Sequence, residues 1–224
     1  MVPFEQILAV IKKQEEHMPG YDIRIDYLRS LYFYASLLPK DAIVIELGTL
    51  YGCSLVTMAA ALRGKWSIIG IDPALGGTYH YEDQHQPQGY TFTSSYVRVL
   101  KLAEECGLDF NNANSPETGI INLYGSRSWD ILEEFKLREE YRRTPWDLSM
   151  VLIDAEHSQE AIKKDLEWGS LIKPGGYLIL DDYLDFVEKS LKEYIQENPR
   201  WTILHESTQT AVDDWIVTIV RRDS

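Results

Sequence analysis

The stretch of the chain that most constrains its fold is residues 42–54, with the sequence AIVIELGTLYGCS. Its first half is a continuous apolar run closed by Glu46. Its second half is a loop that contains Gly48 and Gly52 and leads into the helical-looking segment LVTMAAAL. An apolar run without alternation, bounded by turn residues, is typical of a strand buried on both faces in a parallel α/β sheet. Because open α/β sheets bind ligands at the carboxyl ends of such strands, we expect a cofactor site in this loop.

The segment that follows completes half of a nucleotide-binding unit. Residues 55–62 predict a helix, and residues 66–71 predict a second apolar strand that stops at Asp72. Asp72 follows Gly48 by 72 − 48 = 24 positions, close to the roughly 20 positions at which an acid meets a pair of ribose hydroxyls. The loop has the spacing G-x-x-x-G instead of G-x-G-x-x-G. This spacing disfavours NAD and favours an adenosine ligand without a diphosphate.

The remaining chain predicts further alternation of strands and helices. Apolar strands are expected at 120–124, 148–153 and 177–180, with helices at 95–107, 129–135 and 162–171. Residues 201–205 and 215–220 predict two strands whose link is too short for a parallel crossover, so they should pair antiparallel. The fold class is therefore a Rossmann-like, doubly wound α/β sheet of seven strands, mostly parallel, with a C-terminal antiparallel pair and added N-terminal helices.

Two segments lie outside this alternation. Residues 1–40 predict two amphipathic helices, one of them carrying Phe4, Ile7, Leu8 and Ile11 on a single face. We expect this helical cap to cover a sheet edge, to form a dimer face or to close over a substrate, and residues 41–224 to form the ligand-binding domain. Residues 74–93 are the least regular segment and are expected to be a flexible cover over the pocket.

The composition and charge narrow the class of function. The 22 Lys and Arg residues and the 35 Asp and Glu residues give a formal net charge of −13, which repels nucleic-acid phosphates and anionic membranes. No window approaches the ~18 consecutive apolar residues of a membrane span. Cys53 and Cys106 have no CxxC spacing, and no secretory leader precedes them. We therefore expect a cytoplasmic protein that binds neither nucleic acid nor membrane.

Three acidic residues fall where predicted strands end. Asp154 follows the strand at 148–153, and Asp181 and Asp182 follow the neighbouring strand at 177–180. Three carboxylates at one edge repel one another unless a cation lies among them, and oxygen ligands select Mg²⁺, with Mn²⁺ as its substitute. The alternative is that Asp181 caps the next helix and Asp182 is solvated. In this arrangement we favour the metal site.

Residues 41–220 resemble the class I S-adenosylmethionine-dependent methyltransferases. The segment IELGTLYGCS, which ends at Ser54, is similar to their first motif, whose loop receives the methionine part of the cofactor. The segment GID, which ends at Asp72, is similar to the second motif, whose acid holds the ribose. Residues 151–183, VLIDAEHSQEAIKKDLEWGSLIKPGGYLILDDY, resemble the metal-dependent small-molecule O-methyltransferases of the catechol, macrolide-sugar and cephalosporin-pathway types.

The resemblance implies a set of site residues. Asp154, Asp181 and Asp182 occupy positions that bind Mg²⁺ in those relatives, and Gly125-Ser126 fall where the adenine contacts lie. The predicted cofactor-binding residues are Glu46, Gly48, Thr49, Tyr51, Ser54, Asp72, Gly125, Ser126 and Asp154. Two positions depart from the family pattern: Cys53-Ser54 replace the third glycine of the first motif, and His157 stands where the catechol type has a lysine.

Two residues are candidates for the general base, Glu156 and His157. If the chain stays extended after Asp154, Glu156 points to the same side as Asp154 and His157 points away. The ordinary pKa of histidine, about 6.5, suits proton removal at neutral pH better than that of a carboxylate. A metal-bound hydroxyl reduces that advantage, because the metal already lowers the pKa of the acceptor. Both residues therefore stay candidate catalytic residues.

These features predict an S-adenosylmethionine- and Mg²⁺-dependent O-methyltransferase. Its acceptor would be a small molecule with a hydroxyl group, such as a sugar, another vicinal diol or a catechol-like ring. A non-catalytic S-adenosylmethionine-binding protein would need the glycine loop but not the strand-end acids. A metal-dependent hydrolase or hydroxylase would need the acids but not the loop, and the chain carries both. The N-terminal helices also offer a face for a homo-oligomer.

Overall fold

The computed structural model describes residues 1–14, 18, 23–76, 78–83, 86–93, 96–112, 118–141, 148–155, 158–181, 185–206 and 218–223. Within these residues, seven strands form one sheet in the order β5-β2-β1-β6-β7-β9-β8. The strands are β1 (Ile43–Leu47), β2 (Ser67–Ile71), β5 (Ile120–Tyr124), β6 (Leu148–Ile153), β7 (Tyr177–Leu180), β8 (Trp201–Glu206) and β9 (Thr218–Arg222). The first five strands in this order are parallel, and β9 runs antiparallel to β7 and β8. The predicted fold class is confirmed.

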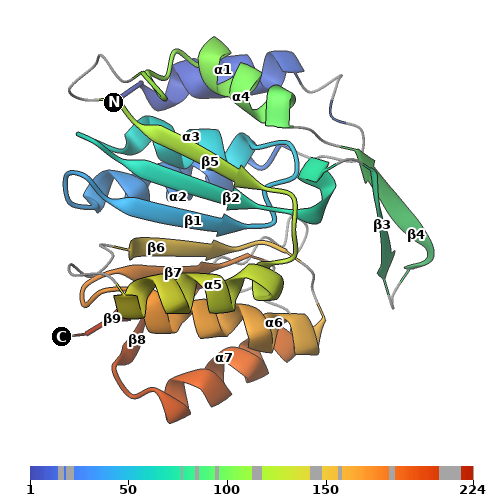
Figure 1. Cartoon of the computed structure of the whole chain (residues 1–224), viewed down its shortest axis with the longest axis vertical. Helices are drawn as coiled ribbons and strands as arrows, with labels where there is room; N and C mark the ends of the chain where they lie inside the picture. The colour runs from blue at the N-terminus through green and yellow to red at the C-terminus, as the bar shows by residue number, and fades with distance from the viewer. Residues whose placement is uncertain are drawn as a thin grey trace.

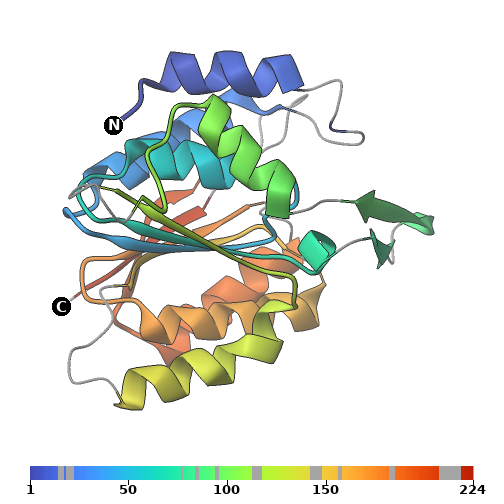
Figure 2. The same cartoon turned by 45° about the horizontal axis from the view of Figure 1, so that its top comes forward.

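Helices cover both faces of the sheet, as Figures 1 and 2 show. One face carries α1 (Phe4–Gln14), α2 (Ile25–Leu37), α3 (Cys53–Ala61) and α4 (Tyr96–Glu105). The other face carries α5 (Ser128–Tyr141), α6 (Gln159–Leu166), the 3₁₀ helix η3 (Glu167–Leu171) and α7 (Asp185–Glu197), which the sequence analysis does not assign. No helix in the described part of the chain has the length and apolar character needed to cross a membrane.

The continuous apolar run of β1 serves two cores at once. Val44 packs into the core shared with α1 to α4, whereas Ile45 and Leu47 pack into the core shared with α5 to α7. In β6, Leu152 faces the first core and Val151 the second. Successive side chains of a strand point to opposite faces, so a strand covered on both sides is apolar at most of its positions. This pattern explains why both strands were recognisable from sequence.

The N-terminal helices lie against the sheet's first helical layer. α2 packs along α3, and α1 contacts both α3 and α4. Ile7 and Ile11 of α1, with Leu28 and Leu31 of α2, are buried in the same core as Val44. The two helices thus cover a face of the domain and bring the start of α2 toward the carboxyl ends of the strands.

The expectation of an irregular segment at 74–93 is wrong. After a 3₁₀ helix, η2 (Pro73–Gly76), the chain forms an antiparallel hairpin of β3 (Thr78–Asp83) and β4 (Gln86–Thr93). Its register pairs Tyr79 with Phe92 and Tyr81 with Tyr90. Tyr, Phe and Thr favour strands, and this preference outweighs the glycine and proline residues that suggested a loop. The hairpin extends away from the body of the domain (Figure 1), and its use as a cover stays a prediction.

Candidate active site

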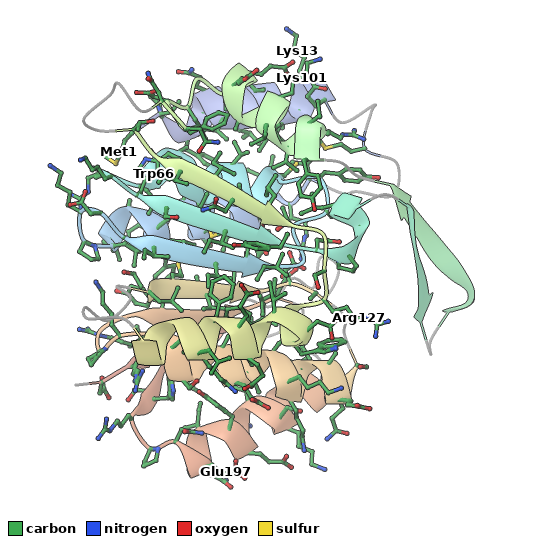
Figure 3. All side chains as sticks on the ribbon, viewed as in Figure 1. Met1, Lys13, Trp66, Lys101, Arg127 and Glu197 are labelled. Atoms are coloured by element: carbon green, nitrogen blue, oxygen red, sulfur yellow. The ribbon has the colours of Figure 1, made fainter. Side chains whose placement is uncertain are left out.

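The carboxyl ends of the parallel strands form one continuous row. Each strand except β5 is followed by a residue whose backbone amide donates to the last carbonyl of the neighbouring strand. These donors are Asp72, Gly48, Asp154 and Asp181, and their acceptors are Tyr124, Ile71, Leu47 and Ile153, at 3.0, 2.8, 2.8 and 3.0 Å respectively. The strand order reverses between β1 and β6, which is the topological switch point where open α/β sheets bind ligands. In Figure 3, Arg127 lies at this carboxyl edge and Trp66 at the opposite edge.

The loop after β1 passes through the left-handed region three times. Gly48, Leu50 and Gly52 have φ angles of 93°, 40° and 83°. A Cβ atom on Gly48 would lie 1.8 Å from the backbone oxygen of Asp154, so only glycine lets the loop approach the end of β6 this closely. Gly52 is the N-cap of α3, and no side chain caps that helix start. The backbone amides of the first turn of α3 point toward the loop, as they do at any helix start.

Glu46 is a buried acid beneath this loop. It is fully buried in β1, and burial raises the pKa of its carboxyl group to about 8, an effect that the nearby hydroxyls of Ser54 and Thr49 only partly offset. Within the described residues, neither carboxyl oxygen of Glu46, nor Oγ1 of Thr49, has a hydrogen-bond partner of good geometry. A buried polar group without a partner costs free energy, so each such group calls for an explanation. A polar ligand at the loop would supply the missing partner.

Asp72 ties the loop after β1 to the turn after β2. Its Oδ2 accepts the amide of Leu50 and its Oδ1 accepts the amide of Ala74, both at 2.7 Å. Burial raises the pKa of Asp72, although the two amide bonds oppose that effect. A carboxylate has about four acceptor positions, so two bonds leave capacity for further donors such as ribose hydroxyls.

Asp181 is paired with a cation from the start of α2. The guanidinium of Arg24 donates to both carboxylate oxygens, with an Nη1–Oδ1 distance of 3.0 Å and a second bond from Nη2 to Oδ2. The side chain of Asp181 is fully buried, and that of Arg24 is only 13% exposed. Burial alone would lower the pKa of Arg24, but the charges of Asp181 and Asp154 outweigh burial and raise it. The guanidinium of Arg24 therefore stays protonated.

Asp154 is held by the same turn of α2. The hydroxyl of Tyr27 donates to Oδ2 of Asp154 at 2.8 Å. Burial, together with the charges of Asp154 and Asp181, raises the pKa of Tyr27 well above its ordinary value, so the hydroxyl stays a donor. The guanidinium of Arg24 lies 4.3 Å from the centre of the Tyr27 ring. One helical turn thus supplies hydrogen-bond donors to two adjacent strand ends.

The predicted metal ligands are brought together only in part. Asp154 and Asp181 end adjacent strands, as predicted, while Asp182 lies outside the described residues. Among the residues that the structure describes, no three His, Cys, Asp or Glu side chains converge in a way that could hold a metal ion. The sequence analysis missed Arg24 and Tyr27. No local signal identifies them, because Arg24 precedes Asp181 by 157 positions.

The other predicted residues are distributed along the same edge. The amide of Gly125 donates to the hydroxyl of Tyr96 at 2.8 Å, and Ser126 is half-buried after β5. Tyr51 is buried in the loop, with the guanidinium of Arg98 4.5 Å from its ring centre. Both candidate bases, Glu156 and His157, lie outside the described residues.

The residue after the candidate bases caps the next helix. The hydroxyl of Ser158 accepts the amide of Ala161 at 3.2 Å, as expected of an N-cap. In the sequence, Asp154 after β6 and Ser158 at the start of α6 flank the two candidate bases.

Comparison with known protein families assigns the class of this chain. A sequence model of the methyltransferase domain family matches residues 45–183, more than half of the chain. The chain therefore belongs to the methyltransferase domain family. The match runs from β1 to just beyond Asp181-Asp182 and so includes the whole row of strand ends. A search of curated protein sequences finds no significant match.

Solved structures share the fold over nearly the whole chain. An O-methyltransferase from Bacillus cereus, in complex with SAH, has a TM-score of 0.60 at 15% identity and covers 97% of this chain and 91% of its own. The O-methyltransferase TomG from Streptomyces achromogenes, involved in tomaymycin synthesis and in complex with SAM, has a TM-score of 0.59 at 17% identity, covering 98% and 90%. An rRNA methylase from Streptococcus thermophilus has a TM-score of 0.56 at 12% identity, covering 91% and 100%. At these identities the similarity establishes the fold.

Proposed function

We propose that the chain transfers a methyl group from S-adenosylmethionine to a hydroxyl group of a small molecule. The observation that carries this proposal is the buried carboxyl group of Glu46, unpartnered among the described residues, beneath a loop that only glycine at position 48 allows. Membership of the methyltransferase domain family supports the reaction class. Two similar structures, both O-methyltransferases, are in complex with SAH or SAM.

The residues around the loop fit such a cofactor. Its ammonium group would give Glu46 the charged partner that the buried carboxyl group needs, and its carboxylate would meet the amides at the uncapped start of α3. Asp72 would accept ribose hydroxyls with the capacity that its two amide bonds leave. The other residues proposed to line the cofactor are Gly48, Thr49, Tyr51, Ser54, Gly125, Ser126 and Asp154.

The cofactor supplies a methyl group on a positively charged sulfur. In the transfer, the bond between sulfur and the methyl carbon breaks, its electron pair stays on sulfur, a carbon–oxygen bond forms and the hydroxyl proton leaves to a base. The chain holds the two reactants in line and takes the proton. Glu156 and His157 stay the proposed candidates for that base, since they follow Asp154 by two and three positions.

Magnesium fits the described residues poorly. Both oxygens of Asp181 accept the guanidinium of Arg24, and Oδ2 of Asp154 accepts the hydroxyl of Tyr27. Mg²⁺ needs carboxylate oxygens at about 2.0–2.1 Å in octahedral geometry, and here it would lie beside a permanent positive charge. The reaction proposed here therefore has no step through a metal ion.

The acceptor is proposed to be a small molecule. The rRNA methylase from Streptococcus thermophilus shows that a similar fold is used on RNA. The net charge of −13, however, opposes binding of a polyanionic substrate, because nucleic-acid affinity rests mainly on cationic contacts to phosphate. A small hydroxylated acceptor meets no such opposition.

Calorimetric titration followed by an acceptor screen tests the proposal. S-Adenosylmethionine and S-adenosylhomocysteine should both bind the wild type, and Glu46→Gln should weaken that binding by about tenfold or more, since a charged hydrogen bond is lost. The control is Glu197→Gln, at the exposed end of α7 (Figure 3), which should bind as the wild type does. Transfer of a labelled methyl group to a hydroxylated acceptor completes the test. Binding without transfer to any acceptor would indicate a non-catalytic binding protein, and absence of binding would overturn the proposal.

A further inference from the structure

This inference rests on the proposed methyl transfer. We propose that the guanidinium of Arg24 provides the positive charge that balances the strand-end acids Asp154 and Asp181. The chain then orients these two carboxylates for methyl transfer without a divalent metal ion. Arg24 and Tyr27 then act as positioning residues of the methyltransferase site. The contacts at the start of α2 support this role, which also affects the class of acceptor that the site takes.

Arg24 and Asp181 form a buried bidentate ion pair. Two parallel hydrogen bonds join the planar guanidinium to the carboxylate, the geometry in which arginine binds carboxylates most strongly. Both side chains are almost removed from water, at 13% and 0% exposure. Separating such a pair leaves an uncompensated buried charge, so it is not given up at small cost.

A divalent ion would compete with this pair for the same oxygens. Arginine stays protonated at all accessible pH values, so the guanidinium cannot make way by losing its charge. An ion at Asp154 and Asp181 would have to share carboxylate oxygens with Arg24 and Tyr27, and it would lie beside the positive charge of the guanidinium. Since α2 is packed into the core through Leu28 and Leu31, its first turn cannot withdraw without disturbing that packing.

Tyr27 extends the effect of Arg24 to the neighbouring strand. Its ring lies against the guanidinium, and its hydroxyl reaches Asp154 beside Gly48, at the point where the strand order reverses. The two residues are three positions apart, so they lie on the same side of the helix start. Asp154 is thereby oriented by a neutral donor and Asp181 by a charged one.

The consequence for substrate class is a relaxed requirement for neighbouring hydroxyls. A metal ion that activates an acceptor favours diols and catechols, because two oxygens can chelate it. A site whose cation is already bound to a carboxylate offers no such chelation. The acceptor class is therefore single hydroxyl groups as well as diols, with the proton taken by a base of the chain.

Binding of Mn²⁺ tests the proposal without any knowledge of the acceptor. The bound ion is measured by electron paramagnetic resonance on the full chain, with and without S-adenosylhomocysteine. We expect the wild type to bind no Mn²⁺ below about 1 mM, whereas Arg24→Gln should bind at least about tenfold more tightly, because two carboxylates then lack their cation. The double variant Arg24→Gln/Asp181→Asn should lose the gained site.

Arg29→Gln is the matched control. Arg29 lies on the same helix, and its ion pair with Asp26 is exposed, so its removal changes the net charge equally without freeing the strand-end acids. It should bind Mn²⁺ as weakly as the wild type. If Arg24→Gln does not fold, the Mn²⁺ measurement on the wild type decides by itself.

Turnover supplies the second readout. With any acceptor found by the screen, the wild-type rate should be unchanged in EDTA, and acceptors with one hydroxyl should react. Micromolar binding of Mn²⁺ to the wild type that is lost in Asp181→Asn, or a rate lost in EDTA and restored by Mg²⁺, would overturn the proposal. Failure of the proposed function looks different, because S-adenosylmethionine would then either not bind or bind without transfer to any acceptor, whatever the Mn²⁺ measurement shows.

Discussion

The two halves of the carboxyl edge satisfy their acids in different ways. Beside β1 and β2, the carboxyl oxygens of Glu46 have no hydrogen-bond partner of good geometry among the described residues, and Asp72 accepts backbone amides of the neighbouring loops. Beside β6 and β7, Asp154 and Asp181 accept bonds from side chains of α2. The acids beside β1 and β2 are therefore available to bind polar groups of a ligand. The acids beside β6 and β7 are already bound by side chains of the protein.

The two halves should therefore differ in whether their acids contribute mainly to ligand binding or mainly to folding stability. An acid whose partner is a ligand lowers the stability of the free protein and gains when the ligand binds. An acid that is partnered inside the protein holds the fold together, and its loss leaves the partner buried and charged. Substitutions beside β1 and β2 should therefore act mainly on cofactor affinity, and those beside β6 and β7 mainly on unfolding.

The largest effect on stability is expected at Asp181. Asp181→Asn should lower the free energy of unfolding by about 3–5 kcal/mol, because the guanidinium of Arg24 loses its anionic partner in a nearly buried site. Urea unfolding followed by circular dichroism measures this change. Arg24→Met/Asp181→Leu removes both charges and should recover most of the loss.

Asp26→Asn is the control for Asp181→Asn. The side chain of Asp26 is 96% exposed in its pair with Arg29, so this substitution should change the free energy of unfolding by less than about 1 kcal/mol. Equal losses of unfolding free energy in the two variants would show that the buried pair of Asp181 and Arg24 does not stabilise the ends of β6 and β7. The proposed difference between the two halves would then be wrong.

Gly48→Ala should lower both the stability of the fold and the affinity for the cofactor, because Gly48 lies where the two halves of the carboxyl edge meet. Its φ of 93° and the 1.8 Å approach of a Cβ to the backbone oxygen of Asp154 predict a loss of roughly 1–3 kcal/mol in stability. The affinity for S-adenosylhomocysteine should fall by on the order of 10²-fold, the cost of a displacement of about 1 Å in a preorganised site. Thermal unfolding and calorimetry measure the two effects.

Gly64→Ala separates strain from binding. Gly64 also has a positive φ, 74°, and an added Cβ would meet side chains of Lys40 and Asp41, far from the carboxyl edge. It should lose stability and keep its cofactor affinity. A loss of affinity in this variant would mean that strain anywhere in the fold, and not the approach of the loop to β6, weakens binding.

Asp72→Asn should act mainly on affinity. If Asp72 accepts ribose hydroxyls, loss of its charge removes about 1.5–3 kcal/mol of binding, a weakening of roughly tenfold to a hundredfold by calorimetry. Asp41→Asn is matched, because Asp41 also accepts a backbone amide, that of Lys65, but at the opposite end of the sheet. Unchanged affinity in Asp72→Asn would move the ribose to another part of the site.

The same division runs through what the sequence could predict. The strands β6 and β7 were predicted with their observed bounds, because strands buried on both faces are largely apolar. The bounds of β5, at the edge of the sheet, were also predicted, from a short and mostly apolar run. Placing Asp72, Asp154 and Asp181 at one edge followed from parallel pairing alone. These inferences need only local patterns and one topological rule.

Contacts between distant segments could not be predicted in this way. Arg24 contacts Asp181 because α2 packs on α3. A local sequence pattern predicts neither the angle of that packing nor the direction of the Arg24 side chain. The hairpin of β3 and β4 was missed because glycine and proline were weighted above the strand preference of tyrosine and threonine. The positive φ of Leu50 likewise depends on its amide bond to Asp72.

The stability of the protein should also depend on pH, and this dependence should originate at Glu46. Its pKa in the folded chain is about 8, above its ordinary value of 4.5, so folding favours the protonated form. The folded state then binds more protons than the unfolded state between these two pKa values, and stability falls as pH rises from about 4.5 to about 8. The contribution of Glu46 is complete below this window and lost above it.

Glu46→Gln should remove this slope, because glutamine carries no charge at any pH. The variant should match the wild type near pH 5 and unfold at a higher temperature near pH 8, by roughly 2–4 °C for each kcal/mol that ionisation of Glu46 costs. Asp72, whose pKa burial also raises, adds a slope of the same sign in both proteins, and the difference between them isolates Glu46. Scanning calorimetry at several pH values measures that difference. Parallel curves for the two proteins would mean that Glu46 already has an internal partner, and the first half of the edge would then resemble the second.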